Sequence, residues 1–243
     1  MSSWMRSRLS EAAGAALNAL YPRHCPCCHE ILKDQKALIC PECRESLSPI
    51  RDPRCVSCGR PVREEEELCS DCLRHPHVFD AGRAVFMYDD VWKLSIEKFK
   101  YYGCREYGDF YAEAMYRILR PALSVWQPEL VIPVPLHPRK KRMRGFNQSW
   151  YLAKRLGEKA GIPASEDVVR KIRDTKSQKK LDAAERRRNL EDAFRVTGPV
   201  AGRRILVVDD VYTTGSTMDA MASALKKKGA SGVCYATFCM SMR

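Results

Sequence analysis

Residues 205–217 read Ile-Leu-Val-Val-Asp-Asp-Val-Tyr-Thr-Thr-Gly-Ser-Thr. The first four are apolar and β-favouring with no polar alternation, which predicts a strand buried on both faces. A helical pattern follows from about Met218 to Lys228, and Gly229 is a natural residue to end it. Strands of this kind occur in parallel sheets flanked by helices, so the stretch predicts an α/β fold.

The turn of this unit, Thr213 to Thr217, is rich in small hydroxylated residues. Backbone N–H groups, hydroxyls and the positive end of the helix dipole favour an anion there, and a phosphate group in particular. Asp209 and Asp210 would repel phosphate, so we expect them to bind a sugar diol or a metal ion shared with the ligand. An ordinary strand–helix unit is the alternative, but helix capping needs only one such side chain. The nucleoside triphosphatase loop Gly-x-x-x-x-Gly-Lys-Ser/Thr does not occur in the chain.

The chain has 243 residues, of which 45% are apolar, so it can form one large domain or a domain with a small module. A net charge of +12 favours anionic partners such as nucleotides, nucleic acid or a membrane surface. Apolar runs near the roughly 18 residues of a membrane span are absent from the sequence. Residues 1–20 predict an amphipathic helix without a signal-peptide core, and we therefore expect a cytoplasmic location.

Cysteine spacing predicts a metal-binding module over residues 21–77. Eight of the 12 cysteines form four Cys-x-x-Cys pairs, which are Cys25/Cys28, Cys40/Cys43, Cys55/Cys58 and Cys69/Cys72. Two such pairs complete a tetrahedral zinc site, so we expect two structural zinc ions. Disulfides are the alternative, but the absence of a secretory signal disfavours them. Sequential pairing is favoured by the short intervals, while a cross-brace stays open; His24, Cys27 and His29 are expected to be bystanders.

Residues 78–243 are expected to form the α/β domain. Strands are predicted at 84–88, 129–135 and 233–240, and helices at 91–100, 108–123 and 147–160, with Asn147 as a capping residue. Residues 138–144 place five cations within six positions, which predicts a solvated basic loop or an anion-binding loop. A second basic region, 168–194, is typical by its charge alone of a solvated linker.

The stretch Val207 to Thr217 resembles the ribose-5-phosphate-binding motif of type I phosphoribosyltransferases. From about Tyr21 to its end, the chain resembles the ComF (competence protein F) family of that superfamily, which carries an N-terminal zinc module. The resemblance implies a type I phosphoribosyltransferase fold with catalytic Asp209 and Asp210 and Mg²⁺ as a cofactor. It implies that the 5-phosphoribosyl group is bound by Val211, Tyr212, Thr213, Thr214, Gly215, Ser216 and Thr217.

Further roles follow from the same resemblance. The pyrophosphate loop would comprise Leu136, His137, Pro138, Arg139 and Lys140. The run Arg144-Gly-Phe-Asn-Gln matches a hallmark of the family, and the Lys100-Tyr-Tyr-Gly turn borders the ligand cleft in that family. Arg144, Arg173, Arg186 and Arg187 would cover pyrophosphate or hold a polyanion.

The implied function is binding of 5-phosphoribosyl diphosphate with Mg²⁺ by a protein that acts in DNA uptake. One alternative is an active phosphoribosyltransferase of nucleotide or amine metabolism with no role in DNA handling, in which pyrophosphate leaves C1 of the ribose. Another is a single-stranded DNA-binding protein with a vestigial nucleotide pocket. In that alternative, residues 139–144 and 170–188 bind the DNA backbone, and Tyr101, Tyr102 or Phe146 stacks on bases. DNA-uptake proteins are the expected protein partners, and the sequence does not identify an acceptor substrate.

Overall fold

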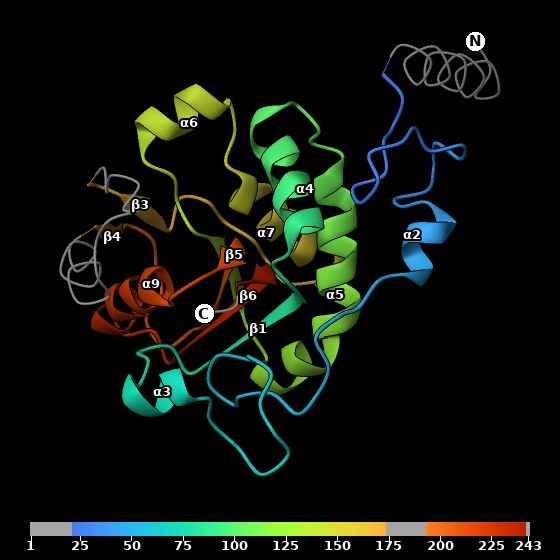
Figure 1. Ribbon diagram of the computed structural model, residues 1–243. Helices are drawn as coiled ribbons and strands as arrows, with labels where there is room; N and C mark the ends of the chain where they lie inside the picture. Colours follow the sequence, from blue (N-terminus) through green and yellow to red (C-terminus); the bar gives the residue numbers. More distant parts are fainter. Residues whose placement is uncertain (1–20, 174–192, 242–243) are drawn as a thin grey trace.

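A computed structural model describes residues 21–173 and 193–241 (Figure 1). The helix expected over residues 1–20 lies outside the described residues, as do Arg186 and Arg187. Among the described residues, no helix combines the length and the apolar character that crossing a bilayer would require.

A four-stranded parallel sheet forms the centre of the molecule, as the run at 205–208 predicts. Its order is β1 (Ala81–Met87), β6 (Gly232–Met240), β5 (Arg204–Tyr212) and β2 (Leu130–Pro133). Ile205 and Val207 join the apolar cluster on one face, whereas Leu206 and Val208 join the cluster on the other. All four side chains are buried. The run is uninterrupted because both faces of β5 are covered.

Three helices cover the face that carries Leu206 and Val208. They are α4 (Asp90–Tyr101), α5 (Tyr107–Trp126) and α7 (Gln148–Ala160). The side chain of Asp89 caps α4 by accepting a hydrogen bond from the Trp92 N–H (2.9 Å). Asn147 caps α7 in the same way through the Ser149 N–H (3.1 Å). The helix capped by Asn147 is thus confirmed.

The opposite face is covered by a different set of elements. Helix α9 (Ser216–Lys227) packs there, together with the antiparallel pair β3 (Val169–Lys171) and β4 (Phe194–Val196). Three aromatic rings fill the space beneath α9. The ring of Tyr212 stacks on that of Tyr235 with centroids 4.7 Å apart, and Phe79 meets Tyr235 edge-on at 4.9 Å.

The cysteine-rich region consists of two similar ribbons. Each has a tight turn after its first cysteine, with Cys25 N–H bonded to the Glu30 carbonyl (2.8 Å) and Cys55 N–H bonded to that of Arg60 (2.7 Å). Each then reaches a short helix, α2 (Pro41–Glu45) or α3 (Ser70–Arg74). The first ribbon contributes to the apolar cluster of α4 and α5, and the second to the cluster of α9. In Figure 1, α2 of the first ribbon is drawn to the right of α5, and α3 of the second is drawn below α9. The two ribbons therefore pack against opposite faces of the sheet.

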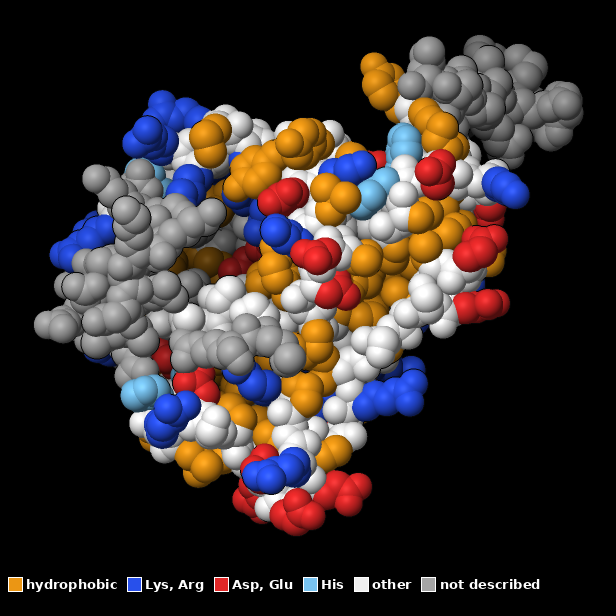
Figure 2. Space-filling view, viewed as in Figure 1, with side chains coloured by type: hydrophobic (Ala, Val, Ile, Leu, Met, Phe, Trp, Pro, Cys, Tyr) orange, Lys and Arg blue, Asp and Glu red, His pale blue; other side chains and the backbone are white. Residues whose placement is uncertain are grey.

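The basic run after β2 differs from the predicted loop. Residues Pro138–Arg144 form a short helix, α6, which begins with Pro138 at its first position and ends at Gly145 with φ 81°. Proline suits the first turn of a helix and glycine suits the left-handed residue that ends it, so local chemistry favours this helix over a loop. Figure 2 shows Lys and Arg side chains gathered over α6, at the upper left of the molecule.

Candidate functional site

The hydroxyl-rich turn follows the carboxyl end of β5 directly. Gly215, with φ 80°, is the residue before the first turn of α9. The hydroxyls of Thr214 and Ser216 lie 2.9 Å apart, and the Thr214 hydroxyl also accepts a weak hydrogen bond from the Ser216 N–H (3.4 Å). Thr213 is exposed, and Thr214 and Thr217 are partly exposed. The turn thus presents hydroxyl groups beside the positive end of α9, an arrangement suited to a phosphate group.

The two acidic residues lie within β5 rather than beyond its end, because the strand continues to Tyr212. Asp209 accepts hydrogen bonds at Oδ1 from the Ser149 hydroxyl (2.6 Å) and from the Asp210 N–H (2.9 Å). Asp210 is buried, and its Oδ1 accepts a weak hydrogen bond from the Gln148 side-chain amide (3.4 Å). Its Oδ2 forms an ion pair with the ammonium group of Lys100. The protein therefore engages both carboxylate oxygens of Asp210.

The surroundings of Asp209 and Asp210 shift the pKa values of their carboxyl groups in opposite directions. Burial, followed by the negative charge of Asp210, raises the pKa of Asp209 to about 7. Burial also acts to raise the pKa of Asp210, but the positive charge of Lys100 outweighs it, and the pKa of Asp210 is lowered. Asp210 is therefore the ionised partner of Lys100, while Asp209 titrates near neutral pH.

Arg144, the first residue of the Arg144-Gly-Phe-Asn-Gln run, is linked to Asp210 through Gln148. Its guanidinium donates a hydrogen bond to the Tyr101 hydroxyl (2.9 Å) and another to the side-chain oxygen of Gln148. It also lies over the Tyr101 ring, 4.9 Å from the centroid. Arg144 thereby holds Gln148, the residue that donates to Asp210. Segments from α4, α6, α7 and β5 meet at this point.

Two residues that contact these acids, Lys100 and Ser149, received no individual role from the sequence. Lys100 lies in the Lys-Tyr-Tyr-Gly turn, whose position beside the cleft was its only signal. Ser149 directly follows the Arg144-Gly-Phe-Asn-Gln run, and the beginning of α7 brings its hydroxyl to Asp209. Tyr212, in contrast, directs its side chain into the core against Tyr235.

The predicted pyrophosphate segment borders a cavity of about 510 Å³. Leu136, His137 and Pro138 line it from one side, and Arg170 and Lys171 of β3 line it from the other. Asp209 and Thr214 are not among its lining residues. Asn147 is, and it directly precedes the two residues that contact the acids. Arg139 is exposed on α6, beside the partly exposed Lys140. Arg173 is described, but it is not among the residues that line this cavity.

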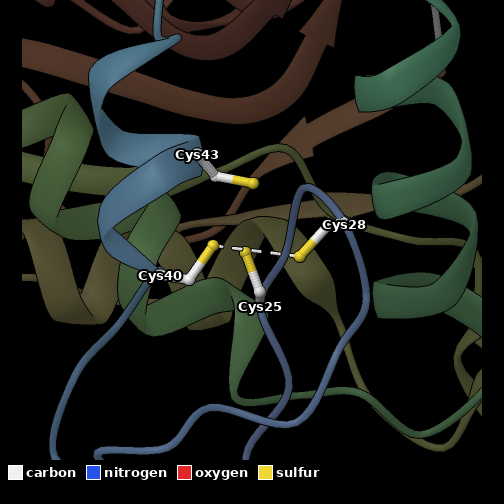
Figure 3. A group of neighbouring side chains, drawn as sticks. All are labelled: Cys25, Cys28, Cys40 and Cys43. Atoms are coloured by element: carbon white, nitrogen blue, oxygen red, sulfur yellow. Dashed lines mark hydrogen bonds between the residues drawn. The ribbon is translucent and has the colours of Figure 1, made fainter.

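The eight paired cysteines form two groups of four. Cys25, Cys28, Cys40 and Cys43 make up one (Figure 3), and Cys55, Cys58, Cys69 and Cys72 make up the other. In each group, the sulfur atoms all lie within 4.8 Å of one another. The sulfurs of Cys28 and Cys40 are 3.9 Å apart, and those of Cys58 and Cys69 are 3.7 Å apart. A tetrahedral zinc ion with bonds of about 2.3 Å would separate its sulfur ligands by about 3.8 Å.

Both groups are therefore four-cysteine zinc-binding sites, and their pairing is sequential rather than crossed. Neither group includes the three neighbouring residues that could have substituted as ligands. Burial raises the pKa of the Cys27 thiol to about 12. The His29 ring instead contacts the Tyr107 hydroxyl of α5 (3.0 Å).

Comparison with known proteins agrees with both parts of the fold. Residues 16–73 match the double zinc ribbon domain, and residues 147–243 match the phosphoribosyl transferase domain. Competence protein F of Haemophilus influenzae is 30% identical over 211 residues, covering 84% of this chain and 91% of that protein. DNA utilization protein YhgH of Salmonella typhimurium is 31% identical with the same coverage. Competence protein ComFC of Bacillus subtilis is 29% identical and covers 79% of each chain.

The sequential four-cysteine sites, the parallel sheet and this similarity along most of the chain lead to one assignment. The chain belongs to the family of competence protein F.

Proposed function

We propose that this protein binds 5-phosphoribosyl diphosphate together with Mg²⁺ and that it acts in the cytoplasm on DNA taken up by the cell. The observation that carries the ligand assignment is the hydroxyl-rich turn at the amino end of α9, directly after Asp209 and Asp210. The names of two relatives, competence protein F and DNA utilization protein YhgH, support the role in DNA handling. The division into a zinc module (21–77) and a phosphoribosyltransferase-like domain (78–243) is part of this proposal.

In the proposed complex, Thr213 to Thr217 hold the 5-phosphate through their backbone N–H groups and hydroxyls. Asp209 accepts hydrogen bonds from the ribose hydroxyls, because it is the partly exposed acid and Asp210 is engaged by Lys100. Lys100 and Gln148 keep Asp210 ionised and fixed, so that its negative charge lies beside the ribose. Bound Mg²⁺ would neutralise charge on the pyrophosphate.

Phosphoribosyl transfer is an extension of this proposal. During transfer, positive charge develops on the ribose and negative charge on the departing pyrophosphate. The reaction therefore relies on electrostatic stabilisation more than on a protein nucleophile. The carboxylates at positions 209 and 210 favour the sugar cation. The segment from Leu136 to Lys140 and Arg144 would favour the leaving pyrophosphate. Screening nucleobases, amines and ammonia for pyrophosphate release tests for turnover directly.

Ligand binding is tested by thermal unfolding with 5-phosphoribosyl diphosphate and Mg²⁺. A ligand at about 100 times its Kd stabilises the native state by about 2.7 kcal/mol, which raises the Tm by several degrees. We expect this rise in wild type and a much smaller one in Asp209→Asn and in Thr214→Val. Asp209→Asn is preferable to a change at Asp210, because loss of the Asp210 charge would leave Lys100 unpaired.

The control is Ser231→Ala. Ser231 lies just before β6, at the opposite end of the sheet from the turn, where its hydroxyl donates to the Gly202 carbonyl (2.9 Å). Its ligand-induced rise in Tm should equal that of wild type. Absence of a rise in wild type, or an equal rise in wild type, Asp209→Asn and Thr214→Val, would contradict the proposal.

A second candidate function is binding of single-stranded DNA, which a basic and aromatic cavity favours. The cavity measures about 420 Å³ and lies along the exposed side of α7. Its lining includes four cations and three aromatic residues, namely Arg105, Lys141, Lys154, Arg155, Phe146, Trp150 and Tyr151. It also includes Glu166, which pairs with Lys141 (3.2 Å). Lys141 and Asn147 also line the cavity beside the predicted pyrophosphate segment, so the two hollows adjoin. Cations that follow a phosphate backbone and rings that stack on bases are the features of single-strand binding sites.

Fluorescence anisotropy with a labelled oligonucleotide tests this function. Trp150→Ala should weaken binding by about fivefold or more, because one base–aromatic stack contributes about 1–3 kcal/mol. Lys154→Gln should reduce the slope of log affinity against log salt concentration by about 0.7. Lys227→Gln, on the exposed surface of α9 at the other face of the sheet, should leave affinity nearly unchanged. Salt-independent binding, or equal losses in all three variants, would contradict this candidate.

A further inference from the structure

His77 connects the second ribbon to α9. It follows helix α3 of that ribbon, and its side chain is only 4% exposed. Its Nδ1 lies 2.9 Å from Oδ2 of Asp219, in the first turn of α9. The neighbouring Val78 N–H donates to the other oxygen of the same carboxylate (2.8 Å). Two consecutive residues after the ribbon thus hold both oxygens of one side chain on α9.

The other side of the imidazole contacts the strand end before the turn. Its Nε2 lies 3.3 Å from the hydroxyl of Tyr212, the last residue of β5. The ring stacks on Phe79 with centroids 4.4 Å apart. Tyr212 and Asp219 flank the turn 213–217 on its two sides, and His77 contacts both of them.

The turn itself lies against the imidazole. A Cβ atom added at Gly215 would be 2.7 Å from Cε1 of His77 and 2.7 Å from the Tyr212 hydroxyl, closer than such atoms approach in proteins. Glycine is therefore required here both by its φ of 80° and by the closeness of His77. The backbone of the turn rests directly on a side chain supplied by the segment that follows the second ribbon.

We propose that His77 is a positioning residue for the phosphate-binding turn. By bridging Tyr212 and Asp219 beneath Gly215, it holds the backbone N–H groups of the turn in the arrangement that receives the 5-phosphate. The energetic reason is preorganisation: a turn that is already ordered loses less conformational entropy when the ligand binds. This inference rests on the proposed binding of a phosphoribosyl ligand at residues 213–217.

The test uses the full-length, zinc-loaded protein and three variants. His77→Leu removes both polar contacts. His77→Asn retains a side-chain N–H that can reach Asp219, so it serves as the conservative rescue. His75→Leu is the control, because His75 lies two residues earlier and is exposed.

The first measurement is hydrogen–deuterium exchange of the ligand-free protein over residues 213–219. His77→Leu should exchange about tenfold faster there, as expected from loss of a hydrogen bond to a charged group. His75→Leu should match wild type, and His77→Asn should lie close to it. The second measurement is the Kd for 5-phosphoribosyl diphosphate with Mg²⁺, which should be about tenfold weaker in His77→Leu and within about threefold of wild type in His77→Asn.

Unchanged exchange in His77→Leu would overturn the inference, as would an equal loss of affinity in His75→Leu. Failure of wild type to bind the ligand would contradict the proposed function instead, while the exchange experiment would still decide the role of His77. Should His77→Leu fail to fold, Asp219→Asn provides the second variant. It keeps the shape of the side chain, weakens both hydrogen bonds and is expected to accelerate exchange over the same residues.

Discussion

The ammonium group of Lys100, at the end of α4, forms an ion pair with the Asp210 carboxylate on β5. The Lys100 side chain is 20% exposed and that of Asp210 is 4% exposed, so water screens the pair only weakly. Burial alone would lower the pKa of Lys100, but the two nearby aspartates outweigh burial, and the pKa is raised. One positive charge from a distant helix thereby stabilises the ionised form of an acid in the central strand.

Lys100→Met is expected to destabilise the protein by about 3 kcal/mol, because it leaves a buried carboxylate without its counter-charge. Urea unfolding measures this loss. Lys93→Met, at an exposed position on the same helix, should change the free energy of unfolding by less than about 0.5 kcal/mol. Adding Asp210→Asn to Lys100→Met should recover part of the stability, since the uncompensated charge is then gone. Equal unfolding midpoints for Lys100→Met and wild type would show that the pair contributes nothing.

Asp209 is expected to make ligand binding depend on pH. Burial and the charge of Asp210 raise its pKa to about 7, so the acceptor form of its carboxylate becomes populated between about pH 6 and pH 8. The affinity for 5-phosphoribosyl diphosphate should rise about tenfold over that interval. Asp209→Asn should show only the smaller pH effect that comes from titration of the ligand's own phosphates. Parallel pH profiles for wild type and Asp209→Asn would show that Asp209 does not take part in ligand binding.

The same shift predicts how stability changes with pH. Because the pKa of Asp209 is raised in the folded state, this state holds a proton that the unfolded chain releases above its ordinary pKa of 3.8. The contribution of Asp209 to the free energy of unfolding is therefore fully present below about pH 4 and is lost as the pH rises through about 7. Denaturation of wild type and Asp209→Asn at several pH values measures the difference, which should grow between pH 4 and pH 7 in favour of the variant. A difference that shrinks over this range would contradict the assignment.

Zinc is expected to leave the two sites at different rates. Cys28 is exposed and Cys40 and Cys43 are partly exposed, whereas all four cysteines of the second site are buried. A colorimetric chelator should therefore release two zinc ions per chain in two phases, with the first site emptied first. Cys28→Ser should remove the fast phase and leave the slow one. A single phase, or loss of the slow phase in that variant, would contradict this order.

Gly215→Ala and Gly161→Ala form a matched pair, since both glycines have positive φ, 80° and 69°. A Cβ at Gly161 would meet nothing within 4 Å, so this change should cost only about 1 kcal/mol for the left-handed conformation. Gly215→Ala should cost about 2–3 kcal/mol in total, because its Cβ also collides with His77 and Tyr212. Chemical denaturation compares the two. Equal losses would indicate that the turn lies farther from His77 than the structure shows.

Much of the fold follows from patterns that extend over a few residues. The uninterrupted run Ile205 to Val208 predicts a doubly buried strand, and β5 is that strand. Asn147 predicts the beginning of α7, because a helix cap depends only on the next few residues. The four Cys-x-x-Cys pairs likewise predict zinc ligands, since each pair acts within one tight turn. The basic run at 138–144 is the exception, because its charge favoured a loop while its proline and glycine ends favour α6.

The remaining features depend on residues that are far apart in the chain. The motif at 209–210 contains two adjacent aspartates, and their pKa values shift in opposite directions because α4 brings Lys100 to Asp210, while burial and the charge of Asp210 act on Asp209. The spacing of the cysteines defines two ribbons, but packing against the sheet assigns them to opposite faces and brings His77 beneath Gly215. Local sequence specifies strands, caps and metal ligands because their energetics lie within a turn or two. The pairing of Lys100 with Asp210 and the packing of the turn against His77 depend on the tertiary structure. The burial of these groups and the distances between them are set only when distant segments of the chain pack together.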